Sequence, residues 1–252
     1  MLNLLRADFY RLKRSKPLYI CSAAVGIFTA LVMINTIFPL VENKETIYPN
    51  TLQWIYLLFN ESGLLPTSIT IFQAIFITMF ITTEFNTGTI RDSVSLGYGR
   101  IKIFTSKLIT VFSGSIIMMF AAIISTLIVS ILVLGVYGSF IVNDLFQLAL
   151  MMLVEGLLFM AFASVFVMIA FIIKNTGGAM SVSICLILFF DFAVSGAQDG
   201  LWRYLWLLMN ISPVAVPNPE IDSIKIAITV AFSYLIVCIA IGGFVFNKQD
   251  IK

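Results

Sequence analysis

Six long runs of apolar residues dominate the chain, and short polar segments separate them. The runs cover residues 17–40, 64–83, 108–136, 145–173, 178–196 and 224–246. Each run is close to or above the roughly 20 apolar residues that an α-helix needs to cross the hydrocarbon layer of a membrane. The pattern therefore predicts an all-α membrane protein, with residues 1–252 forming a single domain of six transmembrane helices.

Positive charge is distributed unevenly between the two sides of these runs. When the six segments are threaded through a membrane, all but three of the 15 Lys and Arg residues lie on the side that holds both termini. The three on the opposite side are Lys44, Arg203 and Lys225. Loops rich in Lys and Arg stay in the cytoplasm. We therefore expect a multi-pass protein of the cell membrane with both termini cytoplasmic.

The composition leaves no room for a soluble domain. Hydrophobic residues make up 60% of the chain, charged residues 11%, and the mean hydropathy is +1.03. The longest segment between runs, 197–223, is too short to bury a core of its own. The cytoplasmic cations match anionic lipid headgroups, and nothing supports a nucleic-acid partner. Any large soluble machinery must therefore belong to another chain.

Several kinds of chemistry are missing from the sequence. The chain has no histidine, which excludes histidine-dependent hydrolysis and His-ligated zinc. It has no G-x-x-x-x-G-K-[ST] phosphate-binding loop, and its three cysteines fall within apolar runs at no metal-ligand spacing. We therefore expect no catalytic residue, no metal site and no cofactor in this chain.

The N-terminal segment 2–16 has the pattern of a basic amphipathic helix. Leu2, Leu5, Phe9 and Leu12 recur at helical spacing, and Arg and Lys residues occupy the other directions. Such a helix lies along the cytoplasmic membrane surface. Its positive charge fits either a simple topology signal or an elbow helix that packs beside its neighbours and moves with them.

The segment 84–107, between the second and third runs, is the longest cytoplasmic loop. Within it, residues 89–96 mix apolar and polar positions in a way that favours a short helix, which Gly97 and Gly99 would end. A compact protrusion with a mixed surface suits the docking of a soluble partner. The alternative is a helical hairpin that packs only on its own protein.

The external segment 197–223 is unusually apolar for a loop, and such a stretch does not sit free in water. Its length predicts an interfacial or shallow re-entrant helix, with aromatic rings at the depth of the lipid headgroups. A plain aromatic anchor is the alternative. The residues on which this prediction rests are Trp202, Arg203, Tyr204 and Trp206.

Two carboxylic acids, Glu155 and Asp191, lie well inside the apolar runs. Inserting such a group costs at least about 2.5 kcal/mol, so something must compensate it. They could mark a substrate path or a proton-coupling site, or they could tie helices together through Gln147 or nearby hydroxyls. Small residues next to Glu155 predict close contact with another helix, which could belong to a second subunit; they are Gly156, Ala161, Ala163 and Ser164.

The loop after the second run carries a family pattern. A Glu at the cytoplasmic end of the run is followed in order by Gly-Thr, by Gly and Arg, and by a Lys at the start of the third run. The matching residues are Glu84, Gly88, Thr89, Gly97, Arg100 and Lys107. With the basic N-terminus, the six runs and the apolar external segment, the chain resembles the type-2 permeases of ABC transporters.

The resemblance implies a half-transporter that pairs with a second permease copy, identical or paralogous. Two separate ABC ATPase subunits would bind ATP and Mg and supply the energy. The loop would carry the coupling helix, with Glu84 and Arg100 bracing it at the membrane surface. The residues expected to contact the ATPase are Thr89, Ile90, Arg91, Asp92, Ser93, Val94 and Leu96.

The resemblance also implies a cargo class. Small stand-alone permeases of this kind belong to bacterial, often Gram-positive, systems that export membrane-active peptides or give immunity to bacteriocins. An ion-coupled secondary transporter that uses Glu155 and Asp191 is one alternative, although residues 1–140 and 141–252 show no convincing inverted repeat. A membrane scaffold or sensor without transport is the other.

Overall fold

The chain folds into a bundle of long helices. A computed structural model describes residues 1–42, 51–60, 64–135, 142–194 and 206–248. Six helices are long and apolar enough to cross a membrane, and the described residues contain no strand. This confirms the all-α membrane fold. The helices are α2 (Lys16–Glu42), α4 (Leu64–Asn86), α6 (Arg100–Leu134), α7 (Val142–Ile173), α8 (Thr176–Val194) and α10 (Ile221–Lys248).

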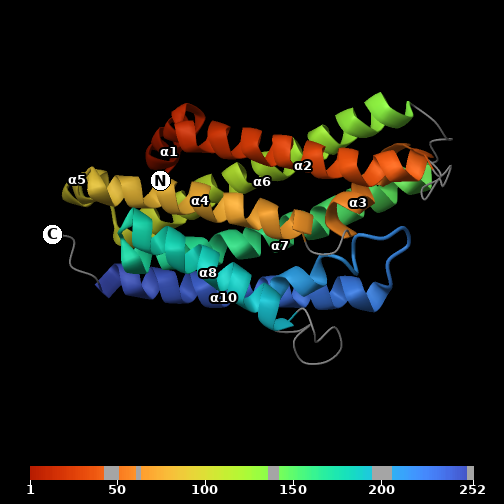
Figure 1. Cartoon of the computed structure of the whole chain (residues 1–252). Coiled ribbons are helices and arrows are strands. Elements are labelled where there is room, and N and C mark those ends of the chain that lie inside the picture. Colours follow the sequence, from red (N-terminus) through yellow and green to blue (C-terminus); the bar gives the residue numbers. More distant parts are fainter. Residues whose placement is uncertain (43–50, 61–63, 136–141, 195–205, 249–252) are drawn as a thin grey trace.

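The two ends of the bundle carry different short elements. Helix α1 (Leu2–Arg14), helix α5 (Thr89–Ser95) and the C-terminal end of α10 gather at one end, and α3 (Ile55–Asn60) lies toward the other (Figure 1). Both ends of the described chain therefore lie on the same side, as an even number of spans requires.

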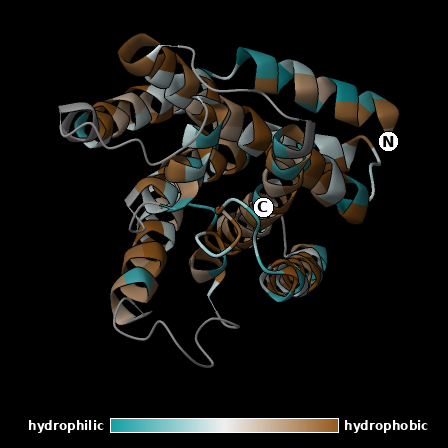
Figure 2. Cartoon of the chain, turned by 90° about the vertical axis from the view of Figure 1, so that its right-hand side faces the viewer, coloured by the Kyte–Doolittle hydropathy of each residue, from teal (hydrophilic) through white to brown (hydrophobic). Residues whose placement is uncertain are grey.

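Helix α7 forms the centre of the bundle. It packs against α10, α4, α6 and α8 and is buried along most of its length, whereas α8 and α10 are largely exposed. Figure 2 shows that hydrophobic residues make up much of the helices, and many large apolar side chains, such as Leu132, Leu153 and Phe192, are exposed. In a membrane, lipid tails would contact these faces.

The small residues of α7 pack inside this one chain. Ala161, Ala163 and Ser164 are buried, and Gly156 faces Met119 of α6, with 3.8 Å between its ideal Cβ position and the methyl carbon of Met119. The expected close helix contact therefore exists, but the neighbours are helices of the same chain. The contact therefore does not require a helix from a second subunit, because α7 is central within this chain.

Glycine also permits a close crossing of α6 over α4. A Cβ on Gly114 would lie 2.6 Å and 2.7 Å from two ring carbons of Phe76, which is buried. No side chain larger than hydrogen fits at this position without displacement of the ring. The contact sets the spacing of the two helices that flank α5.

Short segments fill the bundle at the end opposite α5. The 3₁₀-helix η1 (Thr51–Trp54) leads into α3, and residues 54–59 are all buried. Thr51 donates a hydrogen bond of 3.2 Å to the carbonyl of Gly135, at the end of α6. The side chains of residues 54–59 therefore pack against protein.

Part of the apolar external segment also folds back onto the bundle. Trp206 is 3% exposed and stacks on Phe190 with ring centroids 4.8 Å apart. The 3₁₀-helix η2 (Leu207–Asn210) follows and leads through turns to α10. The indole of Trp206 therefore contacts protein and not lipid headgroups, contrary to expectation. Trp202, Arg203 and Tyr204 lie outside the described residues.

Candidate functional site

Helix α5 is a short protrusion between α4 and α6. Gly88, with φ of +73°, turns the chain out of α4, and Gly97, with φ of +85°, turns it toward α6. Both values lie in the left-handed region that glycine adopts without steric cost. Ile90 is 1% exposed and anchors one side of α5 to the bundle.

The opposite side of α5 faces outward. Arg91, Asp92 and Ser95 are exposed, and Leu96 is 77% exposed at the end of the helix. Thr89, Ser93 and Val94 are half-buried. The outward side of α5 therefore presents both charged groups, at Arg91 and Asp92, and an apolar group, at Leu96.

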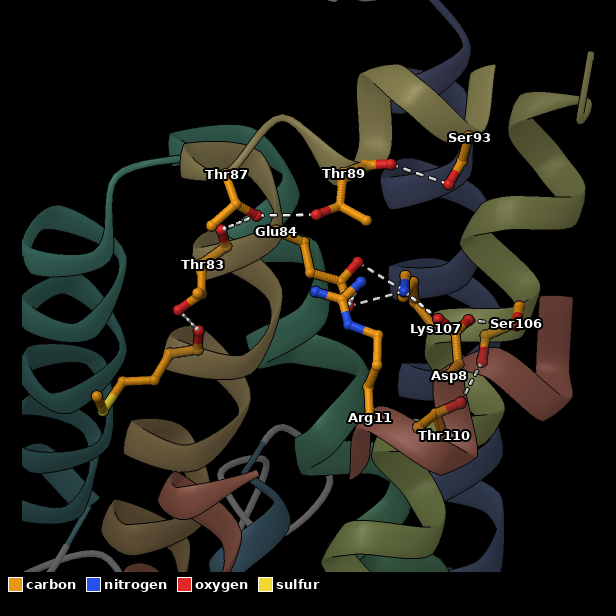
Figure 3. Close-up of polar contacts among 11 residues, drawn as sticks. Asp8, Arg11, Thr83, Glu84, Thr87, Thr89, Ser93, Ser106, Lys107 and Thr110 are labelled. Carbon is orange, nitrogen blue, oxygen red and sulfur yellow. Dashed lines mark hydrogen bonds and ion pairs between the residues drawn. The ribbon is translucent and has the colours of Figure 1, made fainter. Parts of the chain in front are cut away.

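Buried charges lie at the base of α5 and join three helices (Figure 3). We call Asp8, Arg11, Glu84, Ser106 and Lys107 the ionic cluster. The Nζ of Lys107 on α6 lies 2.8 Å from Oε1 and 2.6 Å from Oε2 of Glu84 at the end of α4. It also donates a hydrogen bond to the carboxylate of Asp8 on α1.

The other members complete the cluster. Arg11 on α1 lies 3.3 Å from Glu84, and the hydroxyl of Ser106 donates a 2.5 Å hydrogen bond to Asp8. Two acids thus face two bases. Because Asp8, Glu84 and Lys107 are each at most 3% exposed, loss of one partner would leave a buried charge without compensation. The cluster therefore holds α1, α4 and α6 together at the base of α5.

Sequence reasoning missed Asp8. It placed the apolar face of the N-terminal helix on Leu2, Leu5, Phe9 and Leu12, but the side of α1 that packs on the bundle carries Leu4, Asp8 and Leu12. Leu2 is 82% exposed, on the side available to lipid. The sequence did contain a signal. Asp8 lies four residues from both Leu4 and Leu12, and positions four residues apart share one face of a helix.

Arg100 does not join the ionic cluster. Its Nη1 donates a 2.6 Å hydrogen bond to the carbonyl of Asn247, near the end of α10. The sequence paired Glu84 and Arg100 as braces of the loop. The structure brings Glu84 to α1 and α6, and Arg100 to α10, so the two residues connect the loop to different helices.

Four phenylalanines from four helices pack near the same end of the bundle. Phe171 of α7 lies 5.4 Å from Phe85 of α4, 5.0 Å from Phe104 of α6 and 4.9 Å from Phe246 of α10, measured between ring centroids. We call these residues the aromatic cluster. It connects the two helices that flank α5 to the central helix and to α10.

The two intramembrane carboxylic acids have different surroundings. Asp191 on α8 accepts a 3.0 Å hydrogen bond from Thr67 on α4. Glu155 on α7 is fully buried, and neither of its oxygens has a hydrogen-bond partner among the described residues. Gln147, one of its expected partners, instead donates to Asn218. Asp191 therefore ties two helices together, whereas Glu155 does not.

Comparison with known proteins gives the family. The family described as "ABC-2 family transporter protein" matches residues 4–192, which include most of α1, all of α5 and the ionic cluster. A search of curated proteins found no match to the chain. The chain belongs to the ABC-2 transporter family and is a membrane permease subunit of an ABC transporter, a transport component that is not itself catalytic. Membership in this family implies an ATPase partner in general.

Proposed function

We propose that this permease moves hydrophobic or amphipathic cargo, most specifically membrane-active peptides, out of a bacterial cell. A separate ABC ATPase that binds ATP and Mg would drive it. The exposed outer side of α5 supports the ATPase part of this proposal, because it presents Arg91, Asp92 and Leu96 beyond the spanning helices. A soluble partner can reach these side chains without entering the membrane.

The base of α5 supports a route for mechanical coupling. Closure of an ATPase dimer on ATP would push α5, and α5 is joined to α4 and α6 on either side. The ionic cluster adds α1 to that group, and the aromatic cluster adds α7 and α10. A push at α5 would therefore tilt packed helices together, which is rigid-body coupling.

We further propose that both termini face the cytoplasm and that two permease copies, identical or paralogous, form the transporter. Exposed basic residues of α1, such as Lys13 and Arg14, lie at the same end as α5 and suit an anionic cytoplasmic leaflet. The outward faces of α2, α8 and α10 are apolar, as at Leu31, Phe192 and Phe244. Those of these faces that meet the second copy, and that lipid tails do not cover, would line a cargo path, and apolar walls favour apolar cargo.

Two experiments separate this function from its alternatives. The purified chain should form a stable complex with an ABC ATPase identified by mass spectrometry, whereas an ion-coupled secondary transporter would need none. Vesicles that contain the complex should then move a fluorescent amphipathic peptide when ATP is added. Complex formation without transport of any tested cargo would favour a scaffold or sensor.

A further inference from the structure

A pocket opens at the end of the bundle that carries α5. Its volume is about 400 Å³, and it lies between the end of α4, the turn at Gly88, the first turn of α5 and Lys174, which follows α7. The floor includes Ile90 and Phe85. The pocket is far larger than the roughly 30 Å³ that one water molecule occupies in the liquid, and it has room for a side chain.

The charge of this pocket is one-sided. Arg91 and Lys174 line it, together with polar groups of Asn86 and Thr87, and no Asp or Glu among the described residues lines it. Neither cation forms a salt bridge within the described residues. Lys174 lies over the ring of Phe85, with Nζ 5.8 Å from the centroid. Asp92 neighbours Arg91 in sequence but does not line the pocket. The complementary occupant is an anion.

The backbone at Lys174 adds a second observation. Its φ is +59°, in the left-handed region where side chains other than glycine are unfavourable. Glycine would adopt this turn between α7 and α8 more easily. Lysine therefore occupies this turn at a conformational cost. What the turn contributes to the pocket in return is the positive charge of Lys174.

We infer that this pocket receives an Asp or Glu side chain of the ATPase, so that the turn between α7 and α8 forms part of the docking surface together with α5. The inference rests on the proposed function. An acidic protein side chain fits better than a lipid headgroup, because the Gly88 turn and α5 form part of the wall. An ATPase docked on α5 would cover this opening.

Carbodiimide cross-linking tests the contact directly. The reagent joins a lysine amine to a carboxyl group that touches it. In the purified complex, Lys174 should form an amide with an Asp or Glu of the ATPase. The Lys174→Arg variant should keep its binding but lose this cross-link. Lys174→Glu and Lys174→Gly should each weaken ATPase binding by about tenfold or more. Because glycine suits the turn, loss of binding in Lys174→Gly is not a folding defect.

The matched control is Lys13→Glu, which changes the net charge by the same amount at an exposed site on α1. Its ATPase binding should match the wild type.

If Lys174→Glu binds normally while a Gly/Ser replacement of residues 89–96 does not bind, the pocket inference fails and the proposed function stands. If the effect of Lys174→Glu occurs in nanodiscs of anionic lipid but not of phosphatidylcholine, the pocket holds a headgroup, and the inference is wrong. If no ABC ATPase binds the wild type, the proposed function and the inference fail together.

Discussion

Lys107 on α6 holds the carboxylate of Glu84 on α4 between 2.6 and 2.8 Å from its ammonium group, and both side chains are buried. These residues flank α5 in the sequence, one before it and one after it. Their contact closes the base of the protrusion. Since Lys107 also binds Asp8, the same ammonium group attaches the N-terminal helix to this base.

Removal of this ammonium group should destabilise the protein strongly. In Lys107→Met, Asp8 loses its cation, and Glu84 keeps only Arg11 at 3.3 Å. Breaking a buried charge pair costs about 3–5 kcal/mol. SDS titration in mixed micelles measures the free energy of unfolding. Lys102→Met, at an exposed position of the same helix, should change it by less than about 0.5 kcal/mol. Equal effects of the two variants would show that the ionic cluster does not stabilise the fold.

Replacement of Glu155 by leucine should stabilise the protein, in contrast to the loss of Lys107. Its carboxyl group is buried without a hydrogen-bond partner among the described residues, and such a group costs about 1–3 kcal/mol. Glu155→Leu should therefore raise the free energy of unfolding in the same assay. Glu84→Leu, which breaks an ion pair, serves as the matched control and should lower it. A loss of stability in Glu155→Leu would mean that this carboxyl group has a stabilising partner.

The crossing of α6 over α4 at Gly114 should not tolerate a methyl group. In Gly114→Ala, the new Cβ would lie 2.6 Å from the ring of Phe76. Overpacking of a buried contact costs about 1–3 kcal/mol. Gly26 on α2 is the control, because its nearest neighbours would lie 3.9 Å from a Cβ. Gly26→Ala should be neutral or slightly stabilising, as alanine favours helix. Equal stability of the two variants would contradict the close crossing.

The sequence predicted those parts of the structure that depend on local pattern. The spans follow from the length of apolar runs, and α5 from its mixed residues between Gly88 and Gly97. The ionic cluster could not be predicted, because Asp8, Glu84 and Lys107 meet only after three helices pack. The face of α1 was misjudged because both of its apolar sides, one toward protein and one toward lipid, look alike in sequence. Trp206 was misjudged because an aromatic ring suits a membrane interface and a protein interior equally well.

For the site residues as well, the sequence predicts what depends on local pattern and not what depends on the packing of helices. Glu84 and Lys107 were candidates through the family resemblance, but their mutual contact depends on the tertiary packing of α4 against α6. Asp191 and Glu155 look equivalent in sequence, as single acids in apolar runs. The packing of α4 beside α8 gives Asp191 a hydroxyl partner at Thr67, whereas Glu155 on α7 has no hydrogen-bond partner among the described residues.

We propose that α5 transmits ATP-driven movement from a partner ATPase to the helix bundle. The most direct measurement is the ATPase activity of the purified complex in nanodiscs, compared between the wild type and a variant in which a Gly/Ser linker replaces residues 89–96. The linker variant should lose the ATPase, or leave its activity insensitive to the permease and to added amphipathic peptide. An ATPase that binds the linker variant and responds as it does to the wild type would show that α5 does not transmit the movement.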